Sequence, residues 1–220
     1  MILAVVGGKG GVGKSTVALN LGAELDAVVV DADLGMADLP NARAPDLHDV
    51  LAGRADPVEA VQGVGGVHLL PCGRTLAGAR ASDVTDLASA VEAVAAEYGT
   101  VVVDCPAGMA ADVGVPLLVA EACVLVTTPR PFALADAVRT RELARELDCG
   151  LVAAVLNRVV GDPPTERVRR ALGAPVVSIP DDDRVARAQR HGRPVRSLVG
   201  EKDGLPAQFA TVAEEVRCCR

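Results

Sequence analysis

Near its start the chain reads Gly7-Gly8-Lys9-Gly10-Gly11-Val12-Gly13-Lys14-Ser15-Thr16. From residue 8 to residue 15 this run has the pattern of a phosphate-binding loop, in which a glycine and four further residues precede Gly-Lys-Ser. Glycines let the backbone curl until successive N–H groups point at phosphate oxygens, and a following helix adds its positive N-terminal end. We therefore expect residues 8–16 to bind the phosphates of a nucleotide, with Lys14 on the terminal phosphates and the Ser15 hydroxyl on Mg²⁺.

The residues around this loop alternate between aliphatic runs and helical patterns. A strand at 2–6 precedes the loop and a helix at 15–25 follows it. Further strands are expected at 27–30, 67–70, 100–103, 123–127, 151–156 and 176–179, further helices at 84–98, 110–120, 133–147, 165–172, 182–190 and 205–217, and a loop with two short helices at 34–63. Such alternation predicts an α/β fold with a mostly parallel sheet and helices on both faces, the three-layer fold of P-loop NTPases. No linker, repeat or low-complexity tract interrupts residues 1–220, so we expect a single domain.

The composition fits such a sheet and limits the partners. Of the 220 residues 50% are hydrophobic, with no Trp, one Tyr and two Phe, so we expect a core of Ala, Val and Leu, as in strands buried on both faces. The net charge of −7 does not suit nonspecific DNA binding, which needs clustered Lys and Arg. The six Cys form no CxxC pair, and the sequence has neither an export signal nor an apolar run of about 18 residues. These features predict a reduced, cytoplasmic setting.

Polar residues follow most of the predicted strands at the point where each strand ends. They are Asp31, Asp33, Asp104, Thr127, Asn157 and Asp181. Since ligands of parallel sheets bind beyond the carboxyl ends of the strands, we expect these side chains near the phosphate loop. Metal-assisted hydrolysis needs carboxylates near Mg²⁺ and near the attacking water, and Asp31 and Asp33 are candidates. Two aspartates that merely cap a strand end remain the alternative.

The phosphate loop carries a second lysine, Lys9, near its start. With it the loop resembles the deviant Walker A motif of the MinD/ParA family. In that family the extra lysine reaches across a dimer interface to the nucleotide of the partner subunit, so the resemblance implies ATP as the nucleotide and an ATP-dependent homodimer. Lys9 would then spread positive charge over the transferring phosphoryl group, as an arginine finger does. The resemblance implies Lys9, Lys14 and Asp33 as the catalytic residues.

Two strand ends resemble the switch segments of the same family. Asp31-Ala32-Asp33 is similar to the Walker A′ motif and first switch, which implies that Asp31 supports the phosphate site and that Asp33 places the water and Mg²⁺. Asp104-Cys105-Pro106-Ala107-Gly108 resembles the second switch, DxPxG, whose aspartate binds Mg²⁺ through water. Gly108 would place an N–H near the γ-phosphate and let the segment move after hydrolysis. Ser15, Asp33 and Asp104 are thus the expected Mg²⁺ site.

Two later segments resemble the parts of the family that surround the nucleotide base. Asn157-Arg158 looks like the position that reads adenine, and an amide, which both donates and accepts, suits the edge of that base. Pro180-Asp181-Asp182, with the residues up to 195, is similar to the family's IPxD segment beside the base. The resemblance therefore covers residues 2–195 and implies that Asn157, Pro180 and Asp182 bind ATP. From the residues alone, Asn157 also fits an ordinary loop cap and Asp182 a helix cap.

The chain departs from bacterial-type MinD in two places. The last helix of bacterial-type MinD is Lys-rich and inserts into the membrane, whereas the polar side of the helix at 205–217 carries Glu214 and Glu215, the wrong charge for anionic lipid. Its apolar stripe consists of Leu205, Phe209, Val212, Ala213 and Val216. We expect this stripe to pack on its own domain, as in archaeal-type MinD homologues without a membrane-targeting helix. The second departure, Leu34-Gly35-Met36-Ala37-Asp38-Leu39-Pro40 after the first switch, implies slow hydrolysis or a partner that orders this loop.

The function that the resemblance implies is a positioning switch. ATP would close a two-fold dimer, and hydrolysis would release it and change its affinity for an unidentified protein partner in cell division, motility or polarity. That partner, rather than the chain itself, would bring a cytoplasmic protein to the membrane or a cell pole. Three alternatives stay open. A DNA-partition ATPase like ParA would need a basic dimer face, an iron–sulfur carrier would need interface cysteines, and a P-loop biosynthetic ligase or amidotransferase-type enzyme would lack the extra lysine.

Overall fold

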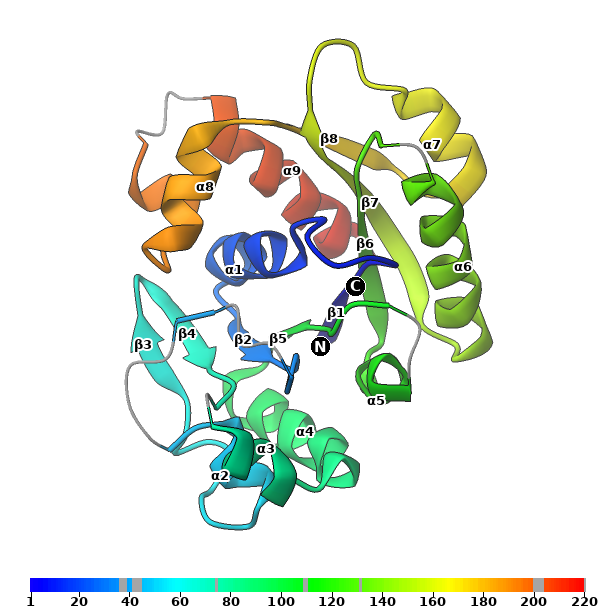
Figure 1. The fold of residues 1–220 in the computed structure, drawn as a ribbon. Coiled ribbons are helices and arrows are strands. Elements are labelled where there is room, and N and C mark those ends of the chain that lie inside the picture. The colour runs from blue at the N-terminus through cyan, green and yellow to red at the C-terminus, as the bar shows by residue number, and fades with distance from the viewer. Residues whose placement is uncertain are drawn as a thin grey trace.

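The computed structural model describes residues 1–35, 39–40, 45–73, 75–108, 111–130, 132–199 and 204–219. Its strands form one sheet in the order β3-β4-β2-β5-β1-β6-β7-β8 (Figure 1). The strands are β1 (Ile2–Val6), β2 (Val28–Asp31), β3 (Gln62–Val64), β4 (Val67–Leu70), β5 (Val101–Asp104), β6 (Ala122–Thr127), β7 (Gly150–Val159) and β8 (Val176–Pro180). Neighbouring strands run parallel except β3 and β4, which are antiparallel. Because β1 lies between β5 and β6, the loop that follows it opens at the middle of the carboxyl edge.

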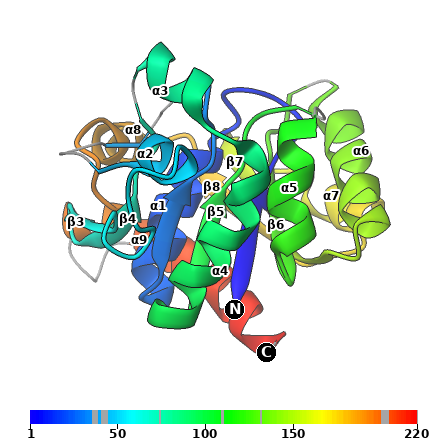
Figure 2. The ribbon, with the colours of Figure 1, turned by 90° about the horizontal axis from the view of Figure 1, so that it is seen from below.

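Helices cover both faces of this sheet. They are α1 (Lys14–Leu25), α2 (Leu47–Leu51), α3 (Leu76–Ala81), α4 (Leu87–Tyr98), α5 (Ala111–Val119), α6 (Ala133–Glu146), α7 (Thr165–Leu172), α8 (Asp183–Arg190) and α9 (Gly204–Cys218), with short 3₁₀ turns η1 (Val84–Asp86) and η2 (Val195–Ser197). Helices α1, α8 and α9 lie on one face (Figure 1). Helices α4, α5, α6 and α7 lie on the other, where α4, α5 and α6 stand side by side (Figure 2). The predicted three-layer α/β fold is confirmed.

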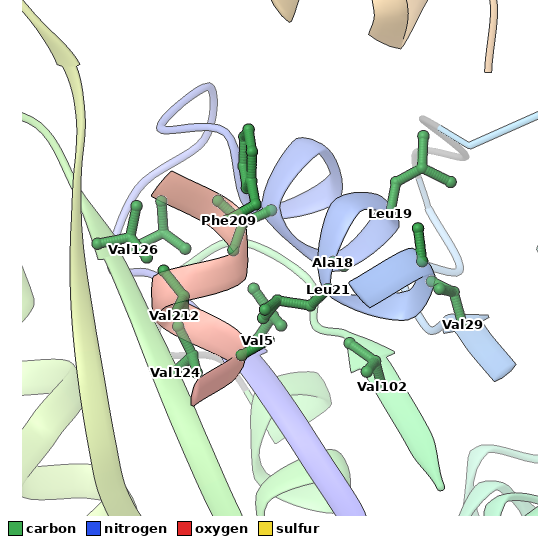
Figure 3. Close-up of a cluster of buried hydrophobic side chains, with 14 of the residues drawn as sticks. Val5, Ala18, Leu19, Leu21, Val29, Val102, Val124, Val126, Phe209 and Val212 are labelled. Atoms are coloured by element: carbon green, nitrogen blue, oxygen red, sulfur yellow. The ribbon is translucent and has the colours of Figure 1, made fainter. Parts of the chain in front are cut away.

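The core has two halves because successive side chains of a strand point to opposite faces. In β1, Leu3 and Val5 belong to the cluster under α1 and α9, and Ala4 belongs to the cluster on the other face. Figure 3 shows Phe209 and Val212 of α9 packed among the strands and α1. Burying a side chain of this size contributes about 1.5–3 kcal/mol. All five residues of the apolar stripe predicted for the last helix are buried, so its packing on the sheet is confirmed.

The region between β2 and α4 differs from the sequence-based expectation. Of the two short helices expected at 34–63, the described residues contain one, α2, and residues 62–64 form β3 instead. Gly65 and Gly66, with φ of 61° and 89°, make the tight turn of the β3–β4 hairpin. The pattern missed β3 because three residues are too few to show alternation. Helix α3 was not expected at all, and residues 36–38 of the departure after the first switch lie outside the described residues, as does residue 110, the predicted start of α5.

The longest strand corrects the placement of one predicted site residue. Strand β7 runs to Val159 and not to residue 156, because its pairing with β8 resumes at Val159 after an irregularity between Leu156 and Val159. Asn157 therefore lies within β7 and not in a loop after it. Among the described residues, no helix combines the length and apolarity needed to cross a bilayer.

Candidate functional site

The phosphate loop joins β1 to α1 and has the backbone that its glycines were expected to allow. Gly11 and Gly13 have φ of 74° and 102°, a conformation that disfavours any residue with a Cβ. Val12 between them is buried in the core, which anchors the tip of the loop. Gly13 is the N-cap of α1 and offers no side-chain cap. The first N–H groups of α1 and the 7% exposed Lys14 are thus placed to bind an anion.

Two other elements hold this loop from the side. Asn157 of β7 donates from Nδ2 to the carbonyl oxygen of Val12 at 2.8 Å. A Cβ added at Gly13 would lie 2.1 Å from that Nδ2, and one added at Gly8 would lie 2.7 Å from the carbonyl oxygen of Asp136 in α6. Neither distance is possible for a real carbon. Tertiary contacts therefore require a glycine at both positions, and the positive φ of Gly13 requires one there as well.

Two buried carboxylates lie beside the loop at the same edge of the sheet. Asp31 ends β2, Asp104 ends β5, and the two are paired in register. Asp31 is fully buried and Asp104 is 1% exposed. Burial first, and then the neighbouring Asp104 carboxylate, raises the pKa of Asp31 well above its usual value. The backbone N–H of Asp33 donates to Asp31 Oδ1 at 3.3 Å, whereas Asp31 Oδ2 accepts no hydrogen bond within the described part of the chain.

This pair fits the predicted divalent cation. A buried carboxylate oxygen without a donor is costly, and a cation beside Asp31 would remove that cost while Asp104 contributed a second carboxylate. The second-switch residues that follow β5 approach the loop, because a Cβ added at Gly10 would lie 4.0 Å from that of Ala107. Gly108 has φ of 99°. The structure thus brings the loop and both switch segments to one edge of the sheet.

Lys9 projects from the tip of the loop. Its side chain is 62% exposed, and its Nζ lies 4.0 Å from Asp136 Oδ2 in the first turn of α6. The same carboxylate accepts from Arg139 at 3.3 Å. A pair this long and exposed contributes little to stability, so Lys9 can leave it at small cost.

The residues predicted to surround the base lie around a cavity of about 360 Å³ next to the loop. Thr16, Asn157, Pro180 and Asp182 all line it, together with Arg158 and residues of α8. Asp182 is also the N-cap of α8, since its side chain accepts from the N–H of Arg184 at 2.8 Å, so the capping alternative holds. The hydrogen bonds from Arg184 lower the pKa of Asp182 to about 2.

The hydrogen bonds of the Asn157 amide are made to the phosphate loop and to the neighbouring backbone. Its Nδ2 donates to Val12, and its Oδ1 accepts from the N–H of Arg158 at 3.0 Å. Arg158 has φ of 57°, a strained value for a residue with a side chain. One N–H and one lone pair of the amide are left for a base.

Comparison with known proteins agrees with this geometry. Residues 3–195 match the CbiA family, described as the CobQ/CobB/MinD/ParA nucleotide binding domain. The chain belongs to this family. The match spans all the segments on which the predicted MinD/ParA resemblance depended.

Proteins similar to this chain include an archaeal ATP-binding protein and two MinD proteins. ATP-binding protein MJ0169 of Methanocaldococcus jannaschii is 34% identical over 203 residues, which are 86% of this chain and 77% of the relative. The cell division ATPase MinD of Pyrococcus furiosus fits with a TM-score of 0.91 at 28% identity, covering 100% of this chain and 99% of the other. The septum site-determining protein MinD of Pyrococcus horikoshii, complexed with Mg-ADP, fits with a TM-score of 0.89 at 28% identity, covering 98% and 95%. The MinD/ParA resemblance is confirmed, and this family binds nucleotide and Mg²⁺.

Sequence reasoning missed Asp136, which contacts both Gly8 and Lys9 of this MinD/ParA loop. An aspartate in the first turn of a helix is common, because it complements the helix dipole, so nothing in the pattern distinguished it. Thr127, which was singled out, donates from Oγ1 to the carbonyl oxygen of Ala133 at 3.2 Å. That bond places it as a support for the start of α6.

Proposed function

We propose that the chain is a MinD-like ATPase whose residues 1–220 act as one ATP-dependent dimerisation switch. The observation that carries the proposal is the arrangement of the two lysines of the phosphate loop. Lys14 is buried beside the carboxylates of the sheet edge, whereas Lys9 is exposed and only loosely paired. A lysine that binds the nucleotide of its own subunit is expected inside the site. A lysine that binds the nucleotide of a second copy is expected to be exposed.

In this proposal each residue has a separate task during hydrolysis. Backbone N–H groups of residues 8–16 hold the phosphates of ATP, and Lys14 neutralises charge between the β- and γ-phosphates. Ser15, Asp33 and Asp104 hold Mg²⁺, with Asp31 behind them, and Asp33 also orients the attacking water. Mg²⁺ acts there as a Lewis acid that stabilises negative charge on phosphate oxygens. Gly108 donates its N–H to the γ-phosphate, and Asn157, Pro180 and Asp182 border the adenine.

A second copy of the chain completes the site in the proposed dimer. Lys9 leaves Asp136 and reaches the phosphates of the partner's ATP. Two apolar side chains near this lysine, Phe132 and Val160, are 81% and 80% exposed. In the sequence they come two residues after Arg130 and Arg158, which line one cavity together with Lys9. Their exposure supports an association surface here. Hydrolysis is expected to be slow and stimulated by a protein partner.

The cellular role is proposed by analogy with the MinD relatives. The switch would act in the cytoplasm on cell-division, motility or polarity machinery, and a partner would recruit it to a membrane or pole. This chain has the fold of a protein in the Aquifex aeolicus MinC:MinD cell division protein complex, in which two different proteins are bound together. The net charge of −7 disfavours the DNA-partition alternative. The exposed Lys9 disfavours a biosynthetic ligase or amidotransferase-type enzyme.

Phosphate release from ATP–Mg²⁺ by the purified chain tests the ATPase. We expect slow turnover that Lys14→Ala abolishes, and Asp33→Ala should bind ATP but not hydrolyse it. Lys9→Ala should also slow turnover, and Arg139→Ala is its matched control, since Arg139 is also a cation paired with Asp136 but has no proposed role. Absence of both ATP binding and hydrolysis in the unmodified protein would sink the proposal.

A further inference from the structure

A buried histidine lies behind the first switch and has no role in the mechanism so far. His48 belongs to α2 and is 3% exposed. Its Nε2 lies 3.3 Å from the carbonyl oxygen of Leu34, the residue that directly follows Asp33. The same Nε2 lies 3.4 Å from Cys72 Sγ, at the end of β4.

The neighbours of the imidazole select one tautomer. The carbonyl oxygen of Leu34 can only accept, so Nε2 must carry the proton and donate to it. The thiol of Cys72 lies 3.4 Å from its acceptor, the carbonyl oxygen of Gly73, which leaves the sulfur facing Nε2 as a weak second acceptor. Nδ1 is then the bare nitrogen, and it is buried without a hydrogen bond within the described residues. His48 therefore makes one strong directional contact, and it is with the first switch.

The surroundings hold the ring firmly. Helix α2 begins with a capping box between Asp46 and Asp49, and the N–H of Leu47 donates to the carbonyl oxygen of Pro71 at 2.9 Å. A Cβ at Gly73 would lie 2.2 Å from His48 Nδ1, and one at Gly78 would lie 2.8 Å from it. These glycines allow two backbone segments to close on the imidazole, so that its Nε2–H points in a fixed direction.

Backbone hydrogen bonds also restrain the first switch. At its start, the N–H of Asp33 donates to Asp31 Oδ1, and the N–H of Leu34 donates to the carbonyl oxygen of Ala32 at 3.0 Å. On its other side residues 32–35 border a cavity of about 450 Å³, shared with Pro106 and Ala107 of the second switch. The side chain of Leu34 packs against the hydrophobic core, and its carbonyl oxygen faces Nε2 of His48.

We propose that His48 is a positioning residue for hydrolysis, which fixes the carbonyl of Leu34 and thereby holds Asp33 in place. The inference rests on the proposed ATPase function. Phosphate binding by residues 8–16 does not depend on this contact, because the loop is held by Asn157 and α6. Loss of the contact should therefore slow hydrolysis without weakening ATP binding.

The experiment compares three variants in steady-state ATP hydrolysis and in ATP binding. His48→Leu keeps the volume but removes the donor, His48→Gln restores an N–H near the Nε2 position, and Cys72→Ala removes only the other neighbour of Nε2. We expect kcat to fall about tenfold or more in His48→Leu, since displacement of a catalytic group by about 1 Å can cost about 100-fold. The KM for ATP should change less than about twofold, and His48→Gln should recover most of kcat. Cys72→Ala should stay within about twofold of the unmodified protein.

Two results would overturn the proposal. One is an unchanged kcat in folded His48→Leu. The other is an equal loss of kcat and ATP affinity in His48→Leu and His48→Gln, which would indicate a purely structural role. If His48→Leu does not fold, His48→Phe replaces it as the variant without a donor, with kcat reduced and KM unchanged as the expected result.

Hydrogen exchange tests the contact between His48 and Leu34 independently of the proposed ATPase function. In the nucleotide-free protein, His48→Leu should exchange faster than the unmodified protein only in peptides that contain residues 32–35. This holds even if the chain hydrolyses no ATP, in which case the proposed function fails and the contact is still tested. Unchanged exchange at residues 32–35 would overturn the contact itself.

Discussion

The phosphate end of the site and the base end are built in different ways. At the phosphate end, Gly13, with a positive φ, lies against β7 and Gly8 lies against α6, both at distances that leave no room for a Cβ. At the base end, the cavity is bordered mainly by α8 and the segment that leads into it, and the ion pair of Asp182 with Arg184 is made within one turn of that helix. The comparison indicates that tertiary contacts fix the phosphate end, whereas the base end can adapt. Changes at the phosphate end should therefore have larger effects.

Gly13→Ala should have the largest effect. The alanine Cβ would meet Asn157 Nδ2 at 2.1 Å, and the residue would keep a φ of +102°. We expect ATP affinity to fall by about 100-fold or more, because the loop must open to admit the methyl group. Titration with a fluorescent ATP analogue measures it.

Gly99→Ala is the matched control for that change. Gly99 also has a positive φ, +82°, but a Cβ there would meet nothing within 4 Å. It should cost about 1 kcal/mol of stability and leave ATP affinity unchanged. If Gly13→Ala binds ATP as Gly99→Ala does, the phosphate end is not fixed in the way described.

Asn157→Leu should show whether Asn157 acts on the phosphate loop or on the adenine. It removes the bond from Nδ2 to Val12, so we expect about a tenfold loss in affinity for ATP–Mg²⁺. Inorganic tripolyphosphate should lose as much, because it shares the loop but has no base. A loss confined to ATP would instead assign Asn157 to adenine, as the sequence suggested.

Asp31→Asn should have opposite effects on stability and on function. Because the folded-state pKa of Asp31 is raised, its charged form destabilises the fold at neutral pH, and this penalty is relieved as pH falls through the raised pKa. The variant should melt higher than the unmodified protein at pH 8, by roughly 2–4 °C per kcal/mol relieved, and the gap should narrow toward lower pH. Circular dichroism without nucleotide measures this, and a lower melting temperature at pH 8 would contradict it. Mg²⁺-dependent ATP affinity should fall.

Arg184→Ala should have the smallest effect, because the ion pair lies at the exposed base end. Arg184 is 43% exposed, and pairs of this kind contribute about 0.2–1 kcal/mol. ATP affinity should change less than about threefold, and the pKa of Asp182 should rise from about 2 toward its usual value. Carboxyl titration by NMR measures the pKa. A loss of ATP affinity as large as that of Gly13→Ala would remove the contrast between the two ends.

The sequence predicted those parts of the molecule that local pattern determines. The phosphate loop, the strands that end at Asp31 and Asp104, and the stripe of α9 follow from spacing alone, and the structure contains them. The gathering of Asn157, Pro180 and Asp182 around one cavity was also anticipated, through the family resemblance.

Features made by long-range contact could not be predicted in this way. Strand β3 exists because it pairs with β4, and its three residues have no pattern of their own. Asp136 and His48 lie in ordinary helical contexts, and only the fold brings them to Lys9 and Leu34. The use of the Asn157 amide to hold Val12 joins residues 145 positions apart. The long-range contacts that hold the phosphate end are therefore the part of the site that a single sequence describes least well.

The mass of the purified protein in solution tests the central claim, that ATP drives dimerisation through Lys9. It should be measured without nucleotide, with ADP–Mg²⁺ and with ATP–Mg²⁺, in the unmodified protein, in Asp33→Ala to trap the ATP state, and in Asp33→Ala with Lys9→Ala. We predict a dimer only with ATP–Mg²⁺, most populated in Asp33→Ala and lost when Lys9 is also replaced. A monomer in every condition despite ATP binding, or a dimer that persists without Lys9, would contradict the account.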